Sequence, residues 1–562
     1  MAPRPDREPP PWQASLSEAL AEALPRLLAA PAEPLVQEAI GALTAALCRG
    51  EPSLPLAGVA PPGVSEALWP EAHRRALQAS RLSRAADGPL VLQGDRLFWR
   101  RWQQRHQEVL AALLARAAGP PAAIGTAASG PAPPPPTDPG ATAPAGLDPI
   151  QRQAVQAALE HPLVLLLGGP GTGKTSTVAR LLEAWLQRHP GGRVQLAAPT
   201  GKAAARLRAA SGGRVPCTTL HRLLESRTEG FGRDRHNPLE LDLLVVDEVS
   251  MLDLELMQAL LAALPDRCQL VLVGDPAQLP PIAPGSLLLA LLDPALTEVL
   301  APVRFELSTV YRNDGAIASV AAALRRQMGA APTEAGADRP LGPLTGLQPL
   351  LTGLGPGDNL QWLEIPPGPL PVAVLQRLRA RRRRLASLAE RCWPDREEGW
   401  QELLAERDRL LVLAPQRRGR WGIEAIHRVL LPAGGSDSNA WPAGTPVLCC
   451  RNLPGLDLAN GDLGILVERL VGATPQRRIL FGHQTPVWHH PAQLSGALEP
   501  ALALTVHKAQ GSEAAEVILL LEQTDGLDPR LLYTGLTRAR QQALLVTATA
   551  TAAAVGPSAA GA

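Results

Sequence analysis

The stretch that decides the fold is LVLLLGGPGTGKTSTVARLLEAWLQR, residues 163–188. Apolar residues at 163–167 predict a buried strand, and residues 177–188 repeat apolar side chains at helical spacing. Between them lies the glycine-rich pattern G-x-x-x-x-G-K-T of residues 168–175. A strand that runs through such a loop into a helix is typical of a nucleoside-triphosphate site, because backbone N–H groups of the loop face the β-phosphate.

The residues of this loop have separate expected roles. Lys174 reaches the β- and γ-phosphates of ATP, and Thr175 ligates magnesium. Only three of the 54 basic residues of the chain are lysines, and Lys174 is one of them. A compact ammonium suits this position better than the planar fork of arginine. The expected nucleotide-binding residues are Gly168, Gly169, Pro170, Gly171, Thr172, Gly173, Lys174, Thr175 and Ser176.

A second apolar run ends in two carboxylates. Residues 243–246 predict a buried strand, and Asp247 and Glu248 follow at its carboxyl end, where α/β sheets place their ligands. We expect Asp247 to hold magnesium and Glu248 to orient and deprotonate the attacking water. An acid beside Asp247 favours hydrolysis over binding alone.

Three further side chains are candidates for the γ-phosphate. Gln278, in the segment GDPAQLPP of residues 274–281, carries an amide that can sense this phosphate through the catalytic water. Arg312, in LSTVYR, and Arg538, in YTGLTRAR, lie in compact motifs far along the chain. Arginines that complete a phosphoryl-transfer site raise its rate by roughly 10³–10⁵.

Short apolar strands alternate with helices over most of the chain, which predicts an α/β fold with parallel sheets. One set of strands is expected at 163–167, 194–198, 242–246 and 270–273, and a second at 410–414, 515–521 and 543–547. The predicted domains are a helical N-terminal domain at 1–116, a linker rich in Pro, Ala and Gly at 117–146, a first ATPase domain at 147–305, and a second domain at 306–550 with a small barrel inserted at about 440–495.

Composition excludes several classes of protein. The net charge is +1, so contact with nucleic acid must come from local patches. The first twelve residues lack the apolar segment of a signal peptide, and no apolar run is long enough to span a membrane. The six cysteines form no C-x-x-C pair, which indicates free thiols in a reducing cytoplasm.

The motifs together resemble the superfamily-one helicases. In order, they are LDPIQ, GGPGTGKT, APTGKAAARL, VVDEVSM, GDPAQLPP, LSTVYR, ALTVHKAQGSE and YTGLTRAR, between residues 147 and 540. The Gln-Leu-Pro-Pro that follows Gly-Asp resembles the 5′-to-3′ branch, and within it the chain is similar to the RecD family, the alpha subunit of the RecBCD enzyme (exodeoxyribonuclease V). This resemblance implies two RecA-like motor domains, an SH3-like barrel as the insertion, and RecB-like and RecC-like partners in a heterotrimer that processes DNA ends for recombinational repair.

The resemblance also implies residue roles. Gln151 would read the nucleotide base, and Lys508 would couple the single-strand track to the nucleotide cleft. The residues expected to contact DNA are Thr200, Lys202, His221, Thr505, His507, Lys508 and Gln510.

Other interpretations stay open at this level. The chain is either a motor subunit of a complex or a free-standing helicase; the short helical N-terminal region favours the complex. A non-catalytic scaffold subunit would be expected to lack Glu248, Gln278 or one of the two arginines Arg312 and Arg538, and all four are present. A nuclease within this chain is disfavoured because no acid stands two residues before any of the three lysines. The arginine-rich run at 377–384 is either a solvated helix face or a nucleic-acid contact.

Overall fold

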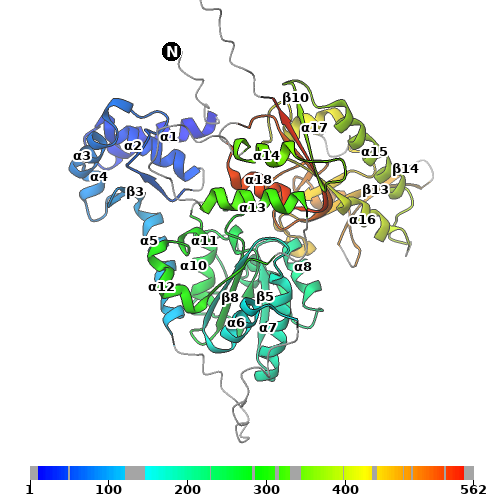
Figure 1. Ribbon diagram of the computed structural model, residues 1–562, viewed down its shortest axis with the longest axis horizontal. Helices are drawn as coiled ribbons and strands as arrows, with labels where there is room; N and C mark the ends of the chain where they lie inside the picture. The colour runs from blue at the N-terminus through cyan, green and yellow to red at the C-terminus, as the bar shows by residue number, and fades with distance from the viewer. Residues whose placement is uncertain are drawn as a thin grey trace, which may run out of the picture.

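The computed structural model describes residues 11–48, 51–119, 146–227, 229–281, 285–309, 315–329, 344–395, 398–432, 440–471, 474–482, 485–524 and 527–549. Two parallel α/β sheets lie at its centre, with a mostly helical N-terminal region beside them and an antiparallel sheet attached to the second (Figure 1). Nearly all of the predicted linker, and also Arg312, fall outside the described residues. Of the helices that the structure describes, none is both long and apolar enough to cross a bilayer.

The first sheet has six parallel strands in the order β6-β5-β7-β8-β4-β9. The strands predicted from apolar runs are all present in it. Strand β4, which leads into the glycine-rich loop, is buried along its whole length between β8 and β9. The strands are β4 (Leu163–Gly168), β5 (Val194–Ala198), β6 (Cys217–Thr219), β7 (Leu243–Val246), β8 (Gln269–Gly274) and β9 (Arg304–Leu307). The helices associated with it include α6 (Pro149–Glu160), α7 (Lys174–Arg188), α8 (Gly201–Ala210), α9 (Leu220–Leu223), α10 (Leu254–Ala263) and α12 (Thr297–Leu300).

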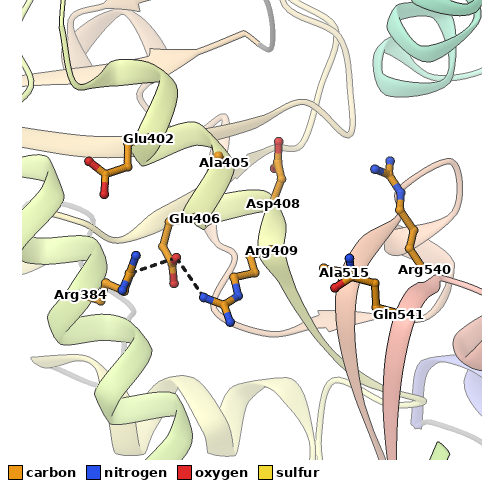
Figure 2. A pocket seen from close by; sticks show the side chains of 9 residues that line it. All are labelled: Arg384, Glu402, Ala405, Glu406, Asp408, Arg409, Ala515, Arg540 and Gln541. Atoms are coloured by element: carbon orange, nitrogen blue, oxygen red, sulfur yellow. Dashed lines mark ion pairs between the residues drawn. The ribbon is translucent and has the colours of Figure 1, made fainter. Parts of the chain in front are cut away.

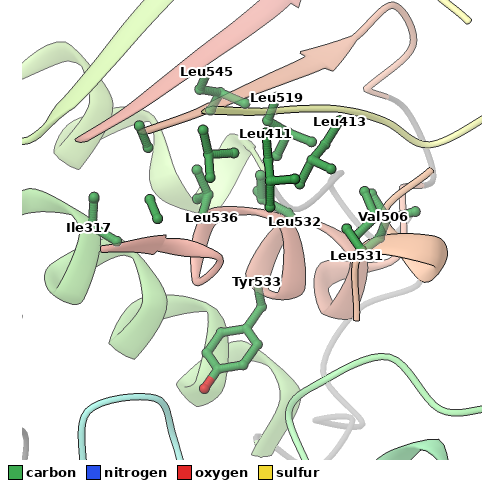
Figure 3. Close-up of a cluster of buried hydrophobic side chains, with 14 of the residues drawn as sticks. Ile317, Leu411, Leu413, Val506, Leu519, Leu531, Leu532, Tyr533, Leu536 and Leu545 are labelled. Carbon is green, nitrogen blue, oxygen red and sulfur yellow. The ribbon is translucent and has the colours of Figure 1, made fainter. Parts of the chain in front are cut away.

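The second sheet has five parallel strands in the order β10-β19-β18-β11-β17. Its apolar core is closed by α18, as Figure 3 shows for Leu531, Leu532 and Leu536. The strands are β10 (Leu360–Ile365), β11 (Leu410–Ala414), β17 (Leu504–Thr505), β18 (Ala514–Leu521) and β19 (Ala539–Ala548). The helices are α13 (Ala316–Gly329), α14 (Gln348–Thr352), α15 (Val372–Ala389), α16 (Trp400–Arg409), α17 (Ile423–Leu430) and α18 (Pro529–Leu536).

An antiparallel sheet of five strands occupies the predicted insertion, in the order β15-β14-β13-β12-β16. It branches from the second sheet between α17 and β17, so both of its connections lie within one α/β unit. Its strands are β12 (Pro446–Cys449), β13 (Leu463–Val471), β14 (Thr474–Phe481), β15 (Val487–His489) and β16 (Leu498–Pro500).

The N-terminal region combines helices with a small antiparallel hairpin. Strands β2 (Leu90–Gln93) and β3 (Arg96–Trp99) pair antiparallel, and β1 (Ser53–Pro55) extends them. Its last helix, α5 (Arg100–Ala118), packs on α10 of the first sheet's layer, where Arg116 donates to the carbonyls of Cys268 and Pro265 at 2.8 and 2.9 Å. The remaining helices are α1 (Pro11–Leu27), α2 (Pro34–Cys48), α3 (Glu71–Ala79) and α4 (Arg81–Arg84).

Candidate ATP site and strand track

The glycine-rich loop folds as its residues predict. Gly171 and Gly173 have φ of +75° and +84°, a region that favours glycine, and α7 begins immediately after Gly173. Lys174 points back into the loop and donates to the carbonyls of Gly168 and Gly169 at 2.7 and 2.8 Å. Burial lowers the pKa of Lys174, and the carboxylates of Asp275 and Glu248 offset part of that shift. The Lys174 ammonium therefore lies inside the loop, where a bound phosphate would replace the two carbonyls as its hydrogen-bond partner.

Gln151 is tied to this loop by a helix cap. The Asp148 carboxylate accepts the Gln151 N–H at 2.8 Å, and the Gln151 side-chain oxygen accepts the Asp148 N–H at 3.1 Å, forming a capping box at the start of α6. The Gln151 amide then donates to the Thr172 carbonyl at 3.3 Å. A residue expected to read the base is thus held against the phosphate loop.

Asp247 and Glu248 emerge from β7 as predicted, and both are buried. Burial and the neighbouring Glu248 raise the pKa of Asp247. Burial alone would raise the pKa of Glu248 too, but the charges of Arg206, Arg538 and Lys174 hold it below its ordinary value. Glu248 has φ of +55°, a left-handed conformation that is strained for a residue with a side chain and often occurs at functional sites.

Arg206 is the site residue that the sequence did not reveal. It projects from α8, donates to Glu248 Oε1 at 2.5 Å and to Glu513 Oε1 at 2.8 Å, and lies 3.9 Å from Asp247 Oδ2. Glu513 stands just before β18 of the second sheet. In a chain whose basic residues are nearly all arginine, only the fold distinguishes this one.

The loop after β8 joins the two sheets. Asp275 is buried in it and accepts the Tyr533 hydroxyl of α18 at 2.7 Å. The buried Gln278 donates to Asp275 Oδ2 at 3.4 Å, while Gln278 Oε1 has no protein partner among the described residues. Leu279 packs in the core of the second sheet, and its N–H is bound by Thr534 Oγ1 at 2.9 Å. Gln278 therefore lies at the boundary of both sheets with one acceptor oxygen to offer.

A second arginine missed by sequence reasoning lies over the phosphate loop. Arg325 of α13 contacts Asp275 at 3.6 Å and donates to the Tyr533 hydroxyl at 3.4 Å. A Cβ placed on Gly169 would run into its guanidinium, so a larger residue there would displace Arg325 from the loop. The second sheet's layer thus brings a cation directly onto the loop.

Of the two predicted arginines, the described residues include Arg538. It is buried at the end of α18, donates to the carbonyls of Thr534 and Ser512 at 3.1 and 3.4 Å, and is near enough for its charge to lower the pKa of Glu248. Arg538 and Glu248 come from different sheets and are 290 positions apart in the sequence. The fold therefore brings Lys174, Glu248, Gln278 and Arg538 to one boundary.

The residues expected on the strand track separate into two groups. Thr200 and Lys202 lie at the interface of the sheets: Lys202 Nζ donates to Ser512 Oγ at 2.9 Å, and a Cβ on the nearby Gly511 would lie 2.9 Å from Thr200 Oγ1. Burial lowers the pKa of Lys202 to about 7, with Asp408 and Asp462 opposing that shift. Gln510 is buried and donates to the Leu279 carbonyl at 2.8 Å.

The second group lies farther along the same segment. Thr505 Oγ1 accepts the Lys508 N–H at 3.3 Å, and Lys508 Nζ donates to Glu499 of β16 at 2.7 Å. His507 is half-buried, and desolvation lowers its pKa. His221 of α9 packs 6.4 Å from the Phe231 ring, measured between centroids. The segment 505–513 thus connects the antiparallel sheet, which Lys508 contacts, to the ATP motifs, which Glu513 contacts through Arg206.

The arginine-rich run lies on α15, where several of its side chains are used by the fold. Arg377 pairs with Glu516, Arg381 donates to the Arg407 carbonyl at 2.7 Å, and Arg384 contacts Glu406 at 3.0 Å. These contacts favour the helix-face interpretation for the three residues.

A cavity of about 460 Å³ lies between α15, α16 and the starts of β18 and β19 (Figure 2). Its charges are matched, since Glu406 pairs with Arg384 and with Arg409 at 3.8 Å, and Arg540 pairs with Glu513 at 3.0 Å. We assign no ligand to it. Its lining residues are Arg384, Glu402, Ala405, Glu406, Asp408, Arg409, Ala515, Arg540 and Gln541.

Comparisons with known proteins agree with this geometry. Residues 151–284 match the AAA domain family, and residues 500–546 match the UvrD-like helicase C-terminal domain. The chain is 34% identical over 519 residues to the RecBCD enzyme subunit RecD of Mycolicibacterium smegmatis, covering 86% of this chain and 83% of that protein. It is 33% identical over 411 residues to the ATP-dependent RecD2 DNA helicase of Deinococcus radiodurans, covering 71% of this chain and 48% of that one.

Among solved structures, the chain is similar to Bacteroides Pif1 bound to single-stranded DNA, with 18% identity, a TM-score of 0.38, and coverage of 71% of this chain and 92% of that one. The stretch that matches the AAA domain lies in the layer of the first parallel sheet, and the stretch that matches the UvrD-like helicase domain lies in that of the second. The sequence similarity spans both sheets and extends over more than four-fifths of the Mycolicibacterium protein. The chain therefore belongs to the RecD family of RecBCD enzyme subunits.

Proposed function

We propose that this chain is an ATP-dependent 5′-to-3′ DNA helicase and translocase, the motor subunit of a RecBCD-type enzyme that processes double-strand DNA ends. One observation carries the proposal: the nucleotide motifs join the two sheets, since Tyr533 of α18 donates to Asp275 at 2.7 Å and the charge of Arg538 lowers the pKa of Glu248. A site assembled from two sheets can couple nucleotide turnover to their relative motion. Family membership supports DNA as the track.

Within this proposal each residue has a chemical task. Lys174 and the loop N–H groups bind the phosphates, Glu248 orients and deprotonates the attacking water, and Gln278 contacts that water with its free oxygen. Arg312 and Arg538 neutralise charge that develops on the γ-phosphate. Thr175 and Asp247 offer a hydroxyl and a carboxylate, the hard oxygen donors that Mg²⁺ prefers. When bound, Mg²⁺ would supply charge neutralisation between the β- and γ-phosphates.

The single strand would lie along the track residues. Thr200, Lys202, His221, Thr505, His507, Lys508 and Gln510 would contribute to it, directly or by holding the segment that does. Such contacts to phosphate and stacked bases are independent of sequence and sensitive to salt. The antiparallel sheet at 446–500 is assigned as the SH3-like barrel of the family, placed to touch the displaced strand.

We further propose RecB-like and RecC-like partners in a heterotrimer, with nuclease activity in a partner chain and the N-terminal helical region at 1–116 as the docking element. The remaining boundaries are a linker at 117–146, a first motor domain at 147–305 and a second at 306–550. None of the six cysteines, all among the described residues, forms a disulfide, which suits a reducing cytoplasm. The alternative is a helicase that acts without partners; the near full-length match to RecD, against about half of the RecD2 helicase, favours the complex.

The decisive test is Lys174→Gln in the full chain. DNA-stimulated ATPase activity should be lost while the thermal unfolding profile is kept. Arg180→Gln is the matched control, because Arg180 lies on the same helix in an exposed pair with Glu183. If ATP turnover survived in Lys174→Gln, the assigned site would be wrong.

Polarity and partnership need a second experiment. The chain is purified from its host with any bound proteins, and unwinding is measured on duplexes with 5′ or 3′ single-stranded tails. We expect co-purifying subunits and preference for the 5′ tail. Movement on 3′ tails alone would contradict the polarity, and full activity of the isolated monomer would support the free-standing alternative.

A further inference from the structure

One guanidinium bridges the catalytic carboxylate and the segment proposed to face DNA. Arg206 donates from Nη2 to Glu248 Oε1 at 2.5 Å and from Nη1 to Glu513 Oε1 at 2.8 Å. The Arg206 side chain is 28% exposed, Glu248 7% and Glu513 14%, so both pairs are shielded from solvent. Charge-assisted bonds of this kind are strong and directional, and a planar fork can hold two carboxylates at once.

The bond at Glu248 is expected to restrain catalysis. A general base must turn a carboxylate oxygen toward the attacking water. While Arg206 holds Glu248 Oε1, that oxygen faces a fixed cation instead. The positive φ of Glu248 shows that its backbone is held by its surroundings in a sparsely populated conformation.

The bond at Glu513 leads to the strand track. Glu513 follows Ser512, whose hydroxyl accepts from Lys202 and whose carbonyl accepts from the Arg538 guanidinium. The same short segment carries His507 and Lys508. A shift of residues 505–513 when a strand binds would therefore move Glu513, and Arg206 with it, away from Glu248.

We propose that Arg206 is a positioning residue that restrains Glu248 in the absence of DNA, and that Glu513 is the arm through which a bound single strand withdraws Arg206. In this proposal, DNA stimulates the ATPase because strand binding releases Glu248 from Arg206. This inference rests on the proposed function, because it requires hydrolysis at Glu248 and a strand near residues 505–513.

Substitutions of Arg206 and of Glu513 should change the ATPase in different ways. If the pair only stabilised the fold, both substitutions would have the same effect. Steady-state ATP hydrolysis is measured for the full chain, with any co-purified partners, in the presence and absence of oligothymidylate. Arg206→Gln frees Glu248, so the DNA-free rate should rise about tenfold, as expected for loss of one charge-assisted bond, with KM for ATP nearly unchanged. Glu513→Gln leaves Arg206 on Glu248, so the DNA-free rate should stay low and most of the stimulation should be lost.

Two further variants keep the test sharp. Arg208→Gln, an exposed arginine on the same helix, should behave as wild type. Arg206→Lys keeps the charge but not the fork, so its DNA-free rate should lie between those of wild type and Arg206→Gln, and it serves if Arg206→Gln does not fold. A fall of both rates in a folded Arg206→Gln, or full stimulation in Glu513→Gln, would overturn the inference. Turnover in Lys174→Gln would instead count against the proposed function itself.

Discussion

Tyr533 of α18 donates its hydroxyl to Asp275 Oδ2 at 2.7 Å, and this bond joins the second sheet's layer to the loop after β8 of the first. Tyr533 belongs to the same buried cluster as its neighbours on α18, and Figure 3 shows its ring on the other side of the helix from Leu532 and Leu536. One face of α18 thus builds the core of the second sheet, while this residue reaches toward the nucleotide motifs.

We predict that Tyr533→Phe lowers the DNA-stimulated ATPase rate about tenfold without unfolding the chain. The buried Asp275 would lose a donor, a change that typically costs about 1–3 kcal/mol, and the loop carrying Gln278 would lose one of its two bonds to α18, the other being from the Leu279 N–H to Thr534. ATP turnover and circular dichroism would check this. Ser211→Ala removes an exposed hydroxyl and should have no effect; an equal rate for Tyr533→Phe would show that the bond is dispensable.

The capping box of α6 should affect both stability and nucleotide binding. Asp148→Ala removes the acceptor of the Gln151 N–H, and loss of such a cap costs about 1 kcal/mol. Because Gln151 also holds the Thr172 carbonyl, KM for ATP should rise as well. Asp253→Ala is the matched control, since Asp253 caps α10 by accepting the Leu256 N–H at 2.8 Å. It should lower stability similarly and leave KM for ATP unchanged. The same KM in both variants would show that the Asp148 cap does not affect nucleotide binding.

A buried histidine predicts sensitivity to acid. Burial lowers the pKa of His427 to about 4, and its Nε2 accepts the Ala503 N–H at 3.3 Å. Between about pH 6.5 and 4 the unfolded chain binds this proton and the folded chain does not, so stability falls as the pH drops through that window. The slope from this residue is at most about 1.4 kcal/mol per pH unit.

Urea unfolding at pH 7.5 and pH 5 would isolate that contribution. His427→Gln keeps an acceptor for Ala503 and removes the titration, so it should lose less stability than wild type on acidification. His236→Gln, at an exposed histidine, should follow wild type. If His427→Gln did so too, the ring would not be the group responsible.

Arg407 should be the most costly arginine to remove from the second sheet's layer. Its side chain is fully buried and donates to the carbonyls of Leu463 at 2.6 Å and Gly482 at 3.3 Å, tying α16 to the antiparallel sheet. Arg407→Met leaves those carbonyls without this donor and should lower the free energy of unfolding by about 3 kcal/mol.

Arg409→Met provides the comparison on the same helix. Arg409 is 54% exposed and pairs with Glu516 at 3.2 Å, a contact expected to contribute about 0–1 kcal/mol. Equal losses in the two variants, measured by urea unfolding, would contradict the assignment of Arg407 as the tie between the two elements.

Local patterns predicted the parts of the fold that local chemistry controls. The strands β4, β7 and β8 follow from apolar runs, and the phosphate loop follows from glycines that must adopt positive φ. The hairpin before α5 turns at Gly94, which has φ of +59°. These elements need only their own residues and a buried environment.

The assembly of the site could not be predicted in the same way. Arg206 and Glu513 are 307 positions apart, and Tyr533 and Asp275 are 258 apart, so no periodicity or spacing links them. Because 51 of the 54 basic residues are arginine, residue type does not single out Arg206 or Arg325 either.

The sequence by itself thus determined which chemistry this chain carries: a phosphate loop, a paired acid after a strand, and the ordered motifs of a RecD-family motor. Only the tertiary structure decided how these parts act on one another, through Arg206 on Glu248, Arg325 over Gly169 and Tyr533 on Asp275. The physical reason is range. Backbone geometry and burial patterns are set within a few residues, whereas an ion pair between two sheets exists only after both have folded and packed.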